Sequence, residues 1–84
     1  MENMQDFIEL GKRIRSSKIR QTGKFKSIIM NLQTMETLEI YDQLVIMLLQ
    51  EEINCQCLIN AGSDFKHGEI KEEEFRKFLF ATLA

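Results

Sequence analysis

The clearest chemistry in the sequence comes from seven cations that share one stretch of the chain with no carboxylate among them. They are Lys12, Arg13, Arg15, Lys18, Arg20, Lys24 and Lys26. Residues 10–35 therefore carry a local charge of +7, whereas the rest of the chain holds four basic and all 13 acidic side chains, and the net charge is −2. Because separated charge decides what a surface attracts, this stretch is predicted to bind an anionic partner.

A phosphate backbone is the anion that this stretch suits best. Hydroxyl and amide side chains accompany the cations, and such neutral donors often join basic residues in contacts to nucleic-acid phosphates. They are Ser16, Ser17, Gln21, Thr22 and Asn31. The one aromatic residue in the stretch, Phe25, is expected in the core, so base stacking is not predicted and binding should depend weakly on base sequence. The alternatives are a solvated basic face, or a face that docks on the acidic half of a neighbouring copy.

Catalysis and metal binding have little support in the sequence. The only histidine, His67, lies in a polar stretch beside Gly68, which predicts a turn and not an acid–base site. Together with Cys55 and Cys57 it gives three ligands where a structural zinc ion takes four, although two copies could offer four cysteines across a twofold axis. On a helix the two thiols project in different directions, which disfavours a disulfide. We expect no enzymatic activity, no metal and no cofactor.

The segment from Gly68 to Phe75 resembles the second half of an EF-hand calcium loop. Glu74 stands where the bidentate ligand would lie, but Ser63, Phe65 and His67 occupy the early ligand positions. The Phe65 side chain has no oxygen to donate, so the sequence does not predict a calcium site.

Helices must position these residues. Proline is absent and only four glycines occur, while straight-chain helix formers are abundant. Apolar periodicity predicts helices over residues 3–14, 17–32, 34–59 and 70–83, with one evident loop at 63–68. We expect an all-α fold, a small helical bundle of four to five helices in a single domain, residues 1–84.

The local signals for where these helices begin and end are serine, threonine and glycine. Ser16 or Ser17 is expected to cap the second helix, Thr34 is expected to cap the third, and Ala61-Gly62 is expected to end it.

Two of the expected helices have faces of different character. On the second, a polar face is formed by Arg20, Lys24, Ser27 and Asn31, on a different side from the apolar face. That apolar face consists of Phe25, Ile28, Ile29, Leu32 and Met35. The third helix has a second apolar stripe, namely Ile46, Leu49, Ile53 and Cys57. We expect that stripe either at the centre of the bundle or in contact with another subunit.

Neither a signal peptide nor a membrane span is expected. Acidic residues occupy the first ten positions at Glu2, Asp6 and Glu9. The longest apolar run, residues 44–49, is far shorter than the roughly 20 residues that cross a bilayer. A cytoplasmic protein with no membrane partner is therefore predicted.

The stretch Ser16-Ser17-Lys18-Ile19-Arg20 resembles the Thr/Ser-Ser-x-Ile-Arg signature that opens a core helix in the small helical subunit of type III CRISPR effector complexes. A long apolar helix with an Ala61-Gly62 ending and a last helix with Phe75 and Phe78 follow, as in that family. Ser63 stands where the family has arginine after Ala-Gly.

The resemblance implies a bundle of five or six helices without catalytic activity. Several copies would line a filament and help to hold a guide RNA paired with target RNA. It places Ser17, Lys18 and Arg20 on the RNA-facing side. Arg13, Lys24 and Lys26 would extend that surface.

We therefore expect a non-catalytic, RNA-binding structural subunit of a larger ribonucleoprotein, whose partners are the backbone of guide or target RNA and other protein subunits, including copies of itself. The alternative is a small helical adaptor or inhibitor that binds protein and no nucleic acid.

Overall fold

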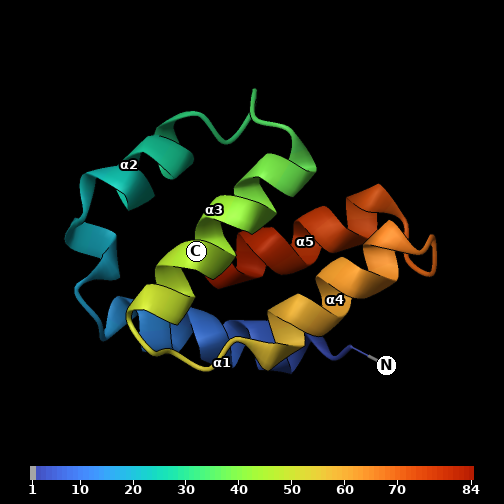
Figure 1. Cartoon of the computed structure of the whole chain (residues 1–84), viewed down its shortest axis with the longest axis horizontal. Helices are drawn as coiled ribbons and strands as arrows, with labels where there is room; N and C mark the ends of the chain where they lie inside the picture. Colours follow the sequence, from blue (N-terminus) through green and yellow to red (C-terminus); the bar gives the residue numbers. More distant parts are fainter. Residues whose placement is uncertain (1) are drawn as a thin grey trace.

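The computed structural model describes residues 2–84 and contains helices with no strand in that range (Figure 1). In chain order the elements are α1 (Met4–Arg15), a 3₁₀ turn η1 (Ile19–Gln21), α2 (Gly23–Met30), α3 (Thr37–Gln50), α4 (Gln56–Lys66) and α5 (Glu72–Leu83). This confirms the expected all-α fold with four to five helices. The turn η1 and α2 form one edge of the molecule, opposite the turn between α4 and α5 (Figure 1).

Helices α1 and α5 make the most extensive helix pair. The rings of Phe7 and Phe78 stack between them, with centroids 4.3 Å apart and planes 9° from parallel. One turn further along, a Cβ on Gly11 would lie 3.0 Å from the carbonyl oxygen of Ala81, so glycine permits the close approach of the two backbones. The glycine that interrupts the apolar stripe of α1 is therefore part of its packing face.

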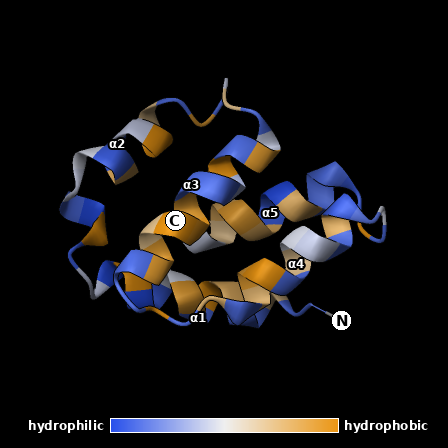
Figure 2. Cartoon of the chain, in the orientation of Figure 1, coloured by the Kyte–Doolittle hydropathy of each residue, from blue (hydrophilic) through white to orange (hydrophobic). Residues whose placement is uncertain are grey.

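The core gathers apolar side chains from all six elements. Its fully buried large residues are Phe7, Leu10, Ile14, Ile19, Ile28, Ile40, Leu44, Leu48, Leu58, Phe75 and Leu79. Hydrophobic bands on α1, α3, α4 and α5 gather toward the middle of the molecule in Figure 2, and hydrophilic bands lie on the outer sides. The periodicity prediction is wrong for Met4, Ile8 and Ile29, which are exposed.

The second helix was predicted over residues 17–32, and its predicted start is wrong. The chain turns at Ser17 and forms only η1 before α2 starts at Gly23. The N-cap of α2 is Thr22, whose Oγ1 accepts a hydrogen bond from the amide of Phe25 at 3.2 Å. Thr22 has the side-chain chemistry that a helix start needs, and so it supplies the cap that the sequence analysis assigned to Ser16 or Ser17.

The long third helix predicted over residues 34–59 is in fact two helices. Glu52 adopts a left-handed conformation with φ of 56°, and the amide of Ile53 donates to the carbonyl of Leu48 at 2.9 Å. This pattern ends α3 in the way that a glycine usually does. Cys55 occupies the N-cap position of α4, and the Oδ1 atom of the preceding Asn54 accepts from the amide of Gln56, the first residue of that helix, at 3.0 Å. The beginning of α3 also differs, because Glu36 and not Thr34 occupies its N-cap position.

Ala61 and Gly62 do not end a helix, as the sequence analysis predicted, but lie buried within α4. The expected loop at 63–68 is helical as far as Lys66. The chain reverses at Gly68, whose φ of 77° is in the region that glycine favours.

A cluster of polar side chains holds the connection between α2 and α3 against α5 through hydrogen bonds. The Arg76 guanidinium donates to Thr37 Oγ1 at 2.8 Å and to the carbonyl oxygen of Leu32 at 3.1 Å. Thr37 is buried and its hydroxyl donates in turn to the Glu72 carboxylate. Because a buried hydroxyl needs a partner, this cluster satisfies Thr37 while it orders the connection.

Candidate nucleic-acid interface

The seven cations lie along three consecutive elements of the chain, and we call them the basic rim. The last turn of α1 carries Lys12, Arg13 and Arg15; Lys18 and Arg20 lie at η1; Lys24 and Lys26 lie on α2. All seven side chains are exposed. The rim follows the edge of the molecule formed by the end of α1, η1 and α2 (Figure 1).

Most cations of the basic rim are not neutralised by a carboxylate. Among residues 2–84 the one ion pair within 4 Å joins Lys12 to Glu9 at 3.3 Å. Hydrogen bonds from Gln5 and Lys12 hold the pKa of Glu9 below its usual value. The six other rim cations therefore have no Asp or Glu side chain as a partner in the described part of the chain.

Two arginines of the basic rim also make contacts within the fold. Arg15 donates to the main-chain oxygen of Ala84 at 2.8 Å, which ties the end of α1 to the end of α5. The Arg20 guanidinium lies 5.8 Å from the centre of the Phe25 ring, within the range of a cation–π interaction. The Phe25 side chain is itself only 2% exposed, so it has no free face for a base.

Ser17 contributes to the geometry of the rim through its hydroxyl group. Its Oγ donates to the carbonyl of Ile14 at 2.7 Å and accepts from the amide of Ile19 at 3.1 Å. These bonds hold the turn that presents Lys18. Because the hydroxyl is engaged with the backbone, Ser17 positions the cations beside it and has no free proton for a ligand.

The expected single polar face of Arg20, Lys24, Ser27 and Asn31 is not formed on one helix. Arg20 belongs to η1, whereas Lys24 and Ser27 belong to α2. Asn31 at the end of α2 donates through its amide to the carbonyl of Ser27 at 2.9 Å. The cations are therefore spread along a bent path and not along one straight helix.

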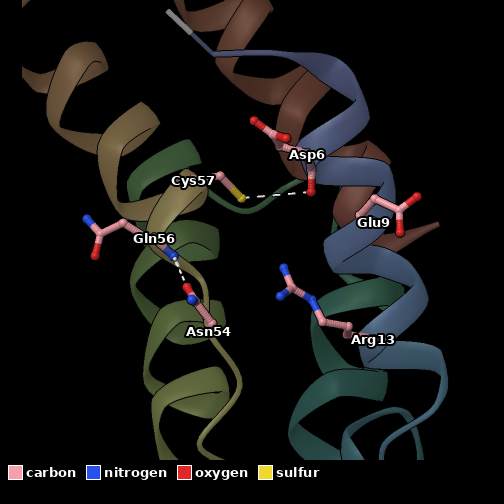
Figure 3. A pocket seen from close by; sticks show the side chains of 6 residues that line it. All are labelled: Asp6, Glu9, Arg13, Asn54, Gln56 and Cys57. Atoms are coloured by element: carbon pink, nitrogen blue, oxygen red, sulfur yellow. Dashed lines mark hydrogen bonds between the residues drawn. The ribbon is translucent and has the colours of Figure 1, made fainter.

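A polar pocket of about 290 Å³ lies between α1 and the beginning of α4 (Figure 3). It is lined by Asp6, Glu9, Arg13, Asn54, Gln56 and Cys57. Of these residues only Arg13 is a nucleic-acid-binding candidate from the sequence, while Cys57 was considered there as a metal ligand. The others could not be found from local patterns because they come from segments about 50 residues apart, which only the packing of α4 on α1 brings together.

The thiol in this pocket is not poised for chemistry. Burial raises the pKa of Cys57, and the nearby Asp6 carboxylate raises it further, while Arg13 acts in the opposite direction. The Sγ atom lies 3.9 Å from the carbonyl oxygen of Asp6, to which it donates a weak hydrogen bond. A neutral thiol is a poor nucleophile, so Cys57 forms a wall of the pocket.

A second hollow, of about 300 Å³, separates α2 from α3 and is lined by Lys24, Gln43, Ile46 and Met47. Beside it the apolar surface is open to solvent. Ile46 is 52% exposed and Leu49 is 58% exposed. These two residues of the predicted second stripe therefore lie on the surface and not at the centre of the bundle.

Histidine and acidic residues do not assemble into a metal cluster within residues 2–84. The EF-hand-like segment has a different structure from a calcium loop, since Ser63 and Phe65 are part of α4. His67 lies at the end of that helix, with Nδ1 3.4 Å from the Ser63 hydroxyl.

Within residues 2–84, every helix is too short or too polar to span a membrane.

The fold and the surface thus define a small all-α protein with an exposed cationic edge. No protein-family model, curated protein sequence or solved structure matches the chain.

Proposed function

We propose that this protein is a non-catalytic structural subunit that binds the RNA backbone within a larger ribonucleoprotein assembly, similar to the small subunit of CRISPR effector complexes. The observation that carries the proposal is the basic rim, in which six exposed cations have no Asp or Glu side chain within 4 Å in the described structure. A surface of this kind gains free energy from a polyanion because phosphate contacts release condensed counterions.

Five cations are free to meet phosphates without loss of a partner that the fold needs. Lys12 is paired with Glu9 and Arg15 with the main chain of Ala84, so neither belongs to this set. The five are Arg13, Lys18, Arg20, Lys24 and Lys26. Together with the positioning residue Ser17 they are the residues to which the sequence analysis assigned nucleic-acid binding.

The proposed assembly also needs a surface for neighbouring subunits. The exposed side chains of Ile46 and Leu49 supply one on α3, and Met30 on α2 is 84% exposed. Neighbouring exposed apolar groups, such as Ile46 and Leu49 one helical turn apart, often mark a protein contact. We propose that other subunits, including copies of the same chain, bind at these two residues of α3.

A paired charge reversal tests the RNA proposal. Arg20→Glu with Lys24→Glu should abolish binding to a fluorescent single-stranded RNA of mixed sequence, measured by anisotropy at low salt. The helical circular-dichroism spectrum should persist because both residues are exposed. Lys71→Glu with Lys77→Glu makes the same charge change on and beside α5 and should retain most of the binding. Equal loss in both variants would mean that total charge, and not the rim, determines RNA binding.

The second candidate function is an adaptor or inhibitor that binds protein alone, and the open apolar side of α2 and α3 favours it. Purification of the protein from its native host distinguishes the two functions. RNA that co-purifies with the wild type and is lost with the Arg20→Glu, Lys24→Glu variant supports the ribonucleoprotein. A protein complex free of RNA, unaffected by that variant, would support the adaptor.

A further inference from the structure

The pocket between α1 and α4 opens directly beside the basic rim. Arg13 belongs to both. A shallow hollow of about 410 Å³ continues from the pocket; it is lined by the cations Lys12 and Arg13, by the carboxylates Glu9 and Glu52, and by Ser16, Ile53 and Asn54. A nucleic-acid strand held by the rim at the end of α1 would therefore pass the mouth of the pocket. A base that is not paired could turn into it.

Two side chains of opposite charge line the pocket and do not form an ion pair with each other. The Asp6 and Arg13 side chains both extend from α1 toward the first turn of α4, whereas Glu9 projects away from it (Figure 3). Neither Asp6 nor Arg13 forms an ion pair within 4 Å in the described structure. Glu9, by contrast, is already engaged by Gln5 and Lys12. The pocket thus offers a free carboxylate and a free guanidinium.

These groups are spaced along one helix by seven residues, or about 10 Å along its axis. That separation is of the order of a purine ring system with one hydrogen bond at each edge. The carboxylate at one end would repel a phosphate, so the pocket is suited to a base and not to the backbone. The rim and the pocket therefore have different ligand chemistries.

We propose that this pocket binds an unpaired guanine base of the RNA held on the basic rim, and this inference rests on the proposed function. Guanine alone among the four bases presents two neighbouring donors, N1–H and N2–H, which a carboxylate such as that of Asp6 accepts together. Its O6 and N7 atoms are the acceptors that arginine recognises in pairs. Arg13 supplies those donors from the opposite end of the pocket.

One neutral group lies on the α4 side of the site. The Asn54 Oδ1 atom accepts from the amide of Gln56, which leaves the Asn54 side-chain nitrogen as a donor. The Gln56 side chain projects away from the gap, and its nitrogen donates to Asn60 at 2.9 Å (Figure 3). On the Watson–Crick edges of adenine, cytosine and uracil, every donor has an acceptor atom next to it. That acceptor would face the Asp6 carboxylate and be repelled by it, so these bases fit less well.

The test compares single-stranded oligouridylates of twelve residues that carry one central guanosine, adenosine or cytidine, or none. Wild-type protein should bind the guanosine probe about tenfold more tightly than the other three, as expected for one bidentate base contact. Asp6→Asn should remove this preference while affinity for plain oligouridylate stays equal or rises. Glu39→Gln removes the same charge at an exposed residue of α3, outside the pocket and the basic rim, and should keep the preference. Thermal melts establish that both variants are folded.

Each remaining outcome overturns a different claim. Tight binding of all four probes with equal affinity by the wild type would remove the guanine pocket and leave the RNA-binding function standing. A preference that survives Asp6→Asn, or that is lost equally in Glu39→Gln, would overturn the assignment to Asp6. No binding of any probe would contradict the proposed function, and the pocket proposal with it.

Discussion

The ring of Tyr41 on α3 lies directly against Gly62 on α4. A Cβ atom built on Gly62 would lie 2.3 Å from Cζ of Tyr41 and 2.5 Å from its hydroxyl oxygen. No side chain larger than hydrogen fits without movement of the ring, which is itself packed against Phe75 with centroids 5.6 Å apart. Gly62 is therefore a packing residue, which explains why a glycine is found inside a buried helix despite its low helix propensity.

We predict that Gly62→Ala destabilises the protein. Overpacking of a filled core typically costs about 1–3 kcal/mol, which outweighs the roughly 1 kcal/mol that alanine gains over glycine in a helix. Urea denaturation followed by circular dichroism measures the difference. Gly23→Ala is the control, because nothing lies within 4 Å of its added Cβ and its stability should stay equal or rise. A Gly62→Ala variant as stable as the wild type would contradict the Tyr41 contact.

Glu52 should be replaceable by glycine with a gain in stability. Its left-handed backbone costs a residue with a Cβ about 1 kcal/mol, and glycine avoids this cost. We expect Glu52→Gly to raise the free energy of unfolding by up to about 1 kcal/mol, measured by thermal or urea denaturation. Glu51→Gly removes the same charge at a residue with φ of −92° and should lower it instead. A loss of stability in Glu52→Gly would mean that α3 and α4 are joined differently.

Arg76 should matter more to stability than its half-exposed position suggests. Arg76→Met keeps much of the side-chain volume but removes the donors to Thr37 and Leu32. Bonds from a charged donor contribute about 1.5–3 kcal/mol, so a loss of about 2 kcal/mol is expected. Hydrogen exchange should accelerate in residues 31–36, which the cluster holds. The neighbouring exposed Lys77→Met should change neither quantity; an equal effect of the two variants would contradict the role of the cluster.

Stability should fall at alkaline pH because of the two cysteines. Burial raises the pKa of Cys55 and of Cys57 above the usual value of 9.0, so in the unfolded chain these thiols lose their protons first. Their contribution is fully present below about pH 9 and is lost as the pH rises through the folded pKa values. Unfolding free energies of the reduced protein between pH 7 and 10.5 measure the slope. Cys57→Ala should be less sensitive to alkali, and an unchanged slope would contradict the burial of this thiol.

Apolar periodicity was sufficient to predict the helical class and much of the core. Leu44 and Leu48, and likewise Phe75 and Leu79, are spaced four apart and are all buried. Periodicity failed for Met4 and Ile8 because the orientation of α1 depends on its contact with α5, which lies about 70 residues away in sequence. That contact uses Gly11, whose role a hydropathy pattern does not reveal.

The helix ends were predicted less well for a physical reason. Helix α3 ends at Glu52 through a left-handed conformation without glycine, and the buried Gly62, ten residues later, led to a false prediction of the helix end. The basic rim was visible in the sequence because its members are local. The pocket was not, since Asp6 and Gln56 meet only after α4 folds onto α1.

The salt dependence of RNA binding tests most directly whether the basic rim contacts phosphates. Anisotropy titrations of a single-stranded RNA between 50 and 300 mM KCl give the slope of log K against log salt, which is about −0.7 for each phosphate contacted. If all five free rim cations take part, the slope should be near −3.5, and it should become shallower in Arg20→Glu, Lys24→Glu. Absence of binding at the lowest salt concentration, or binding that does not weaken as salt rises, would contradict the proposed function.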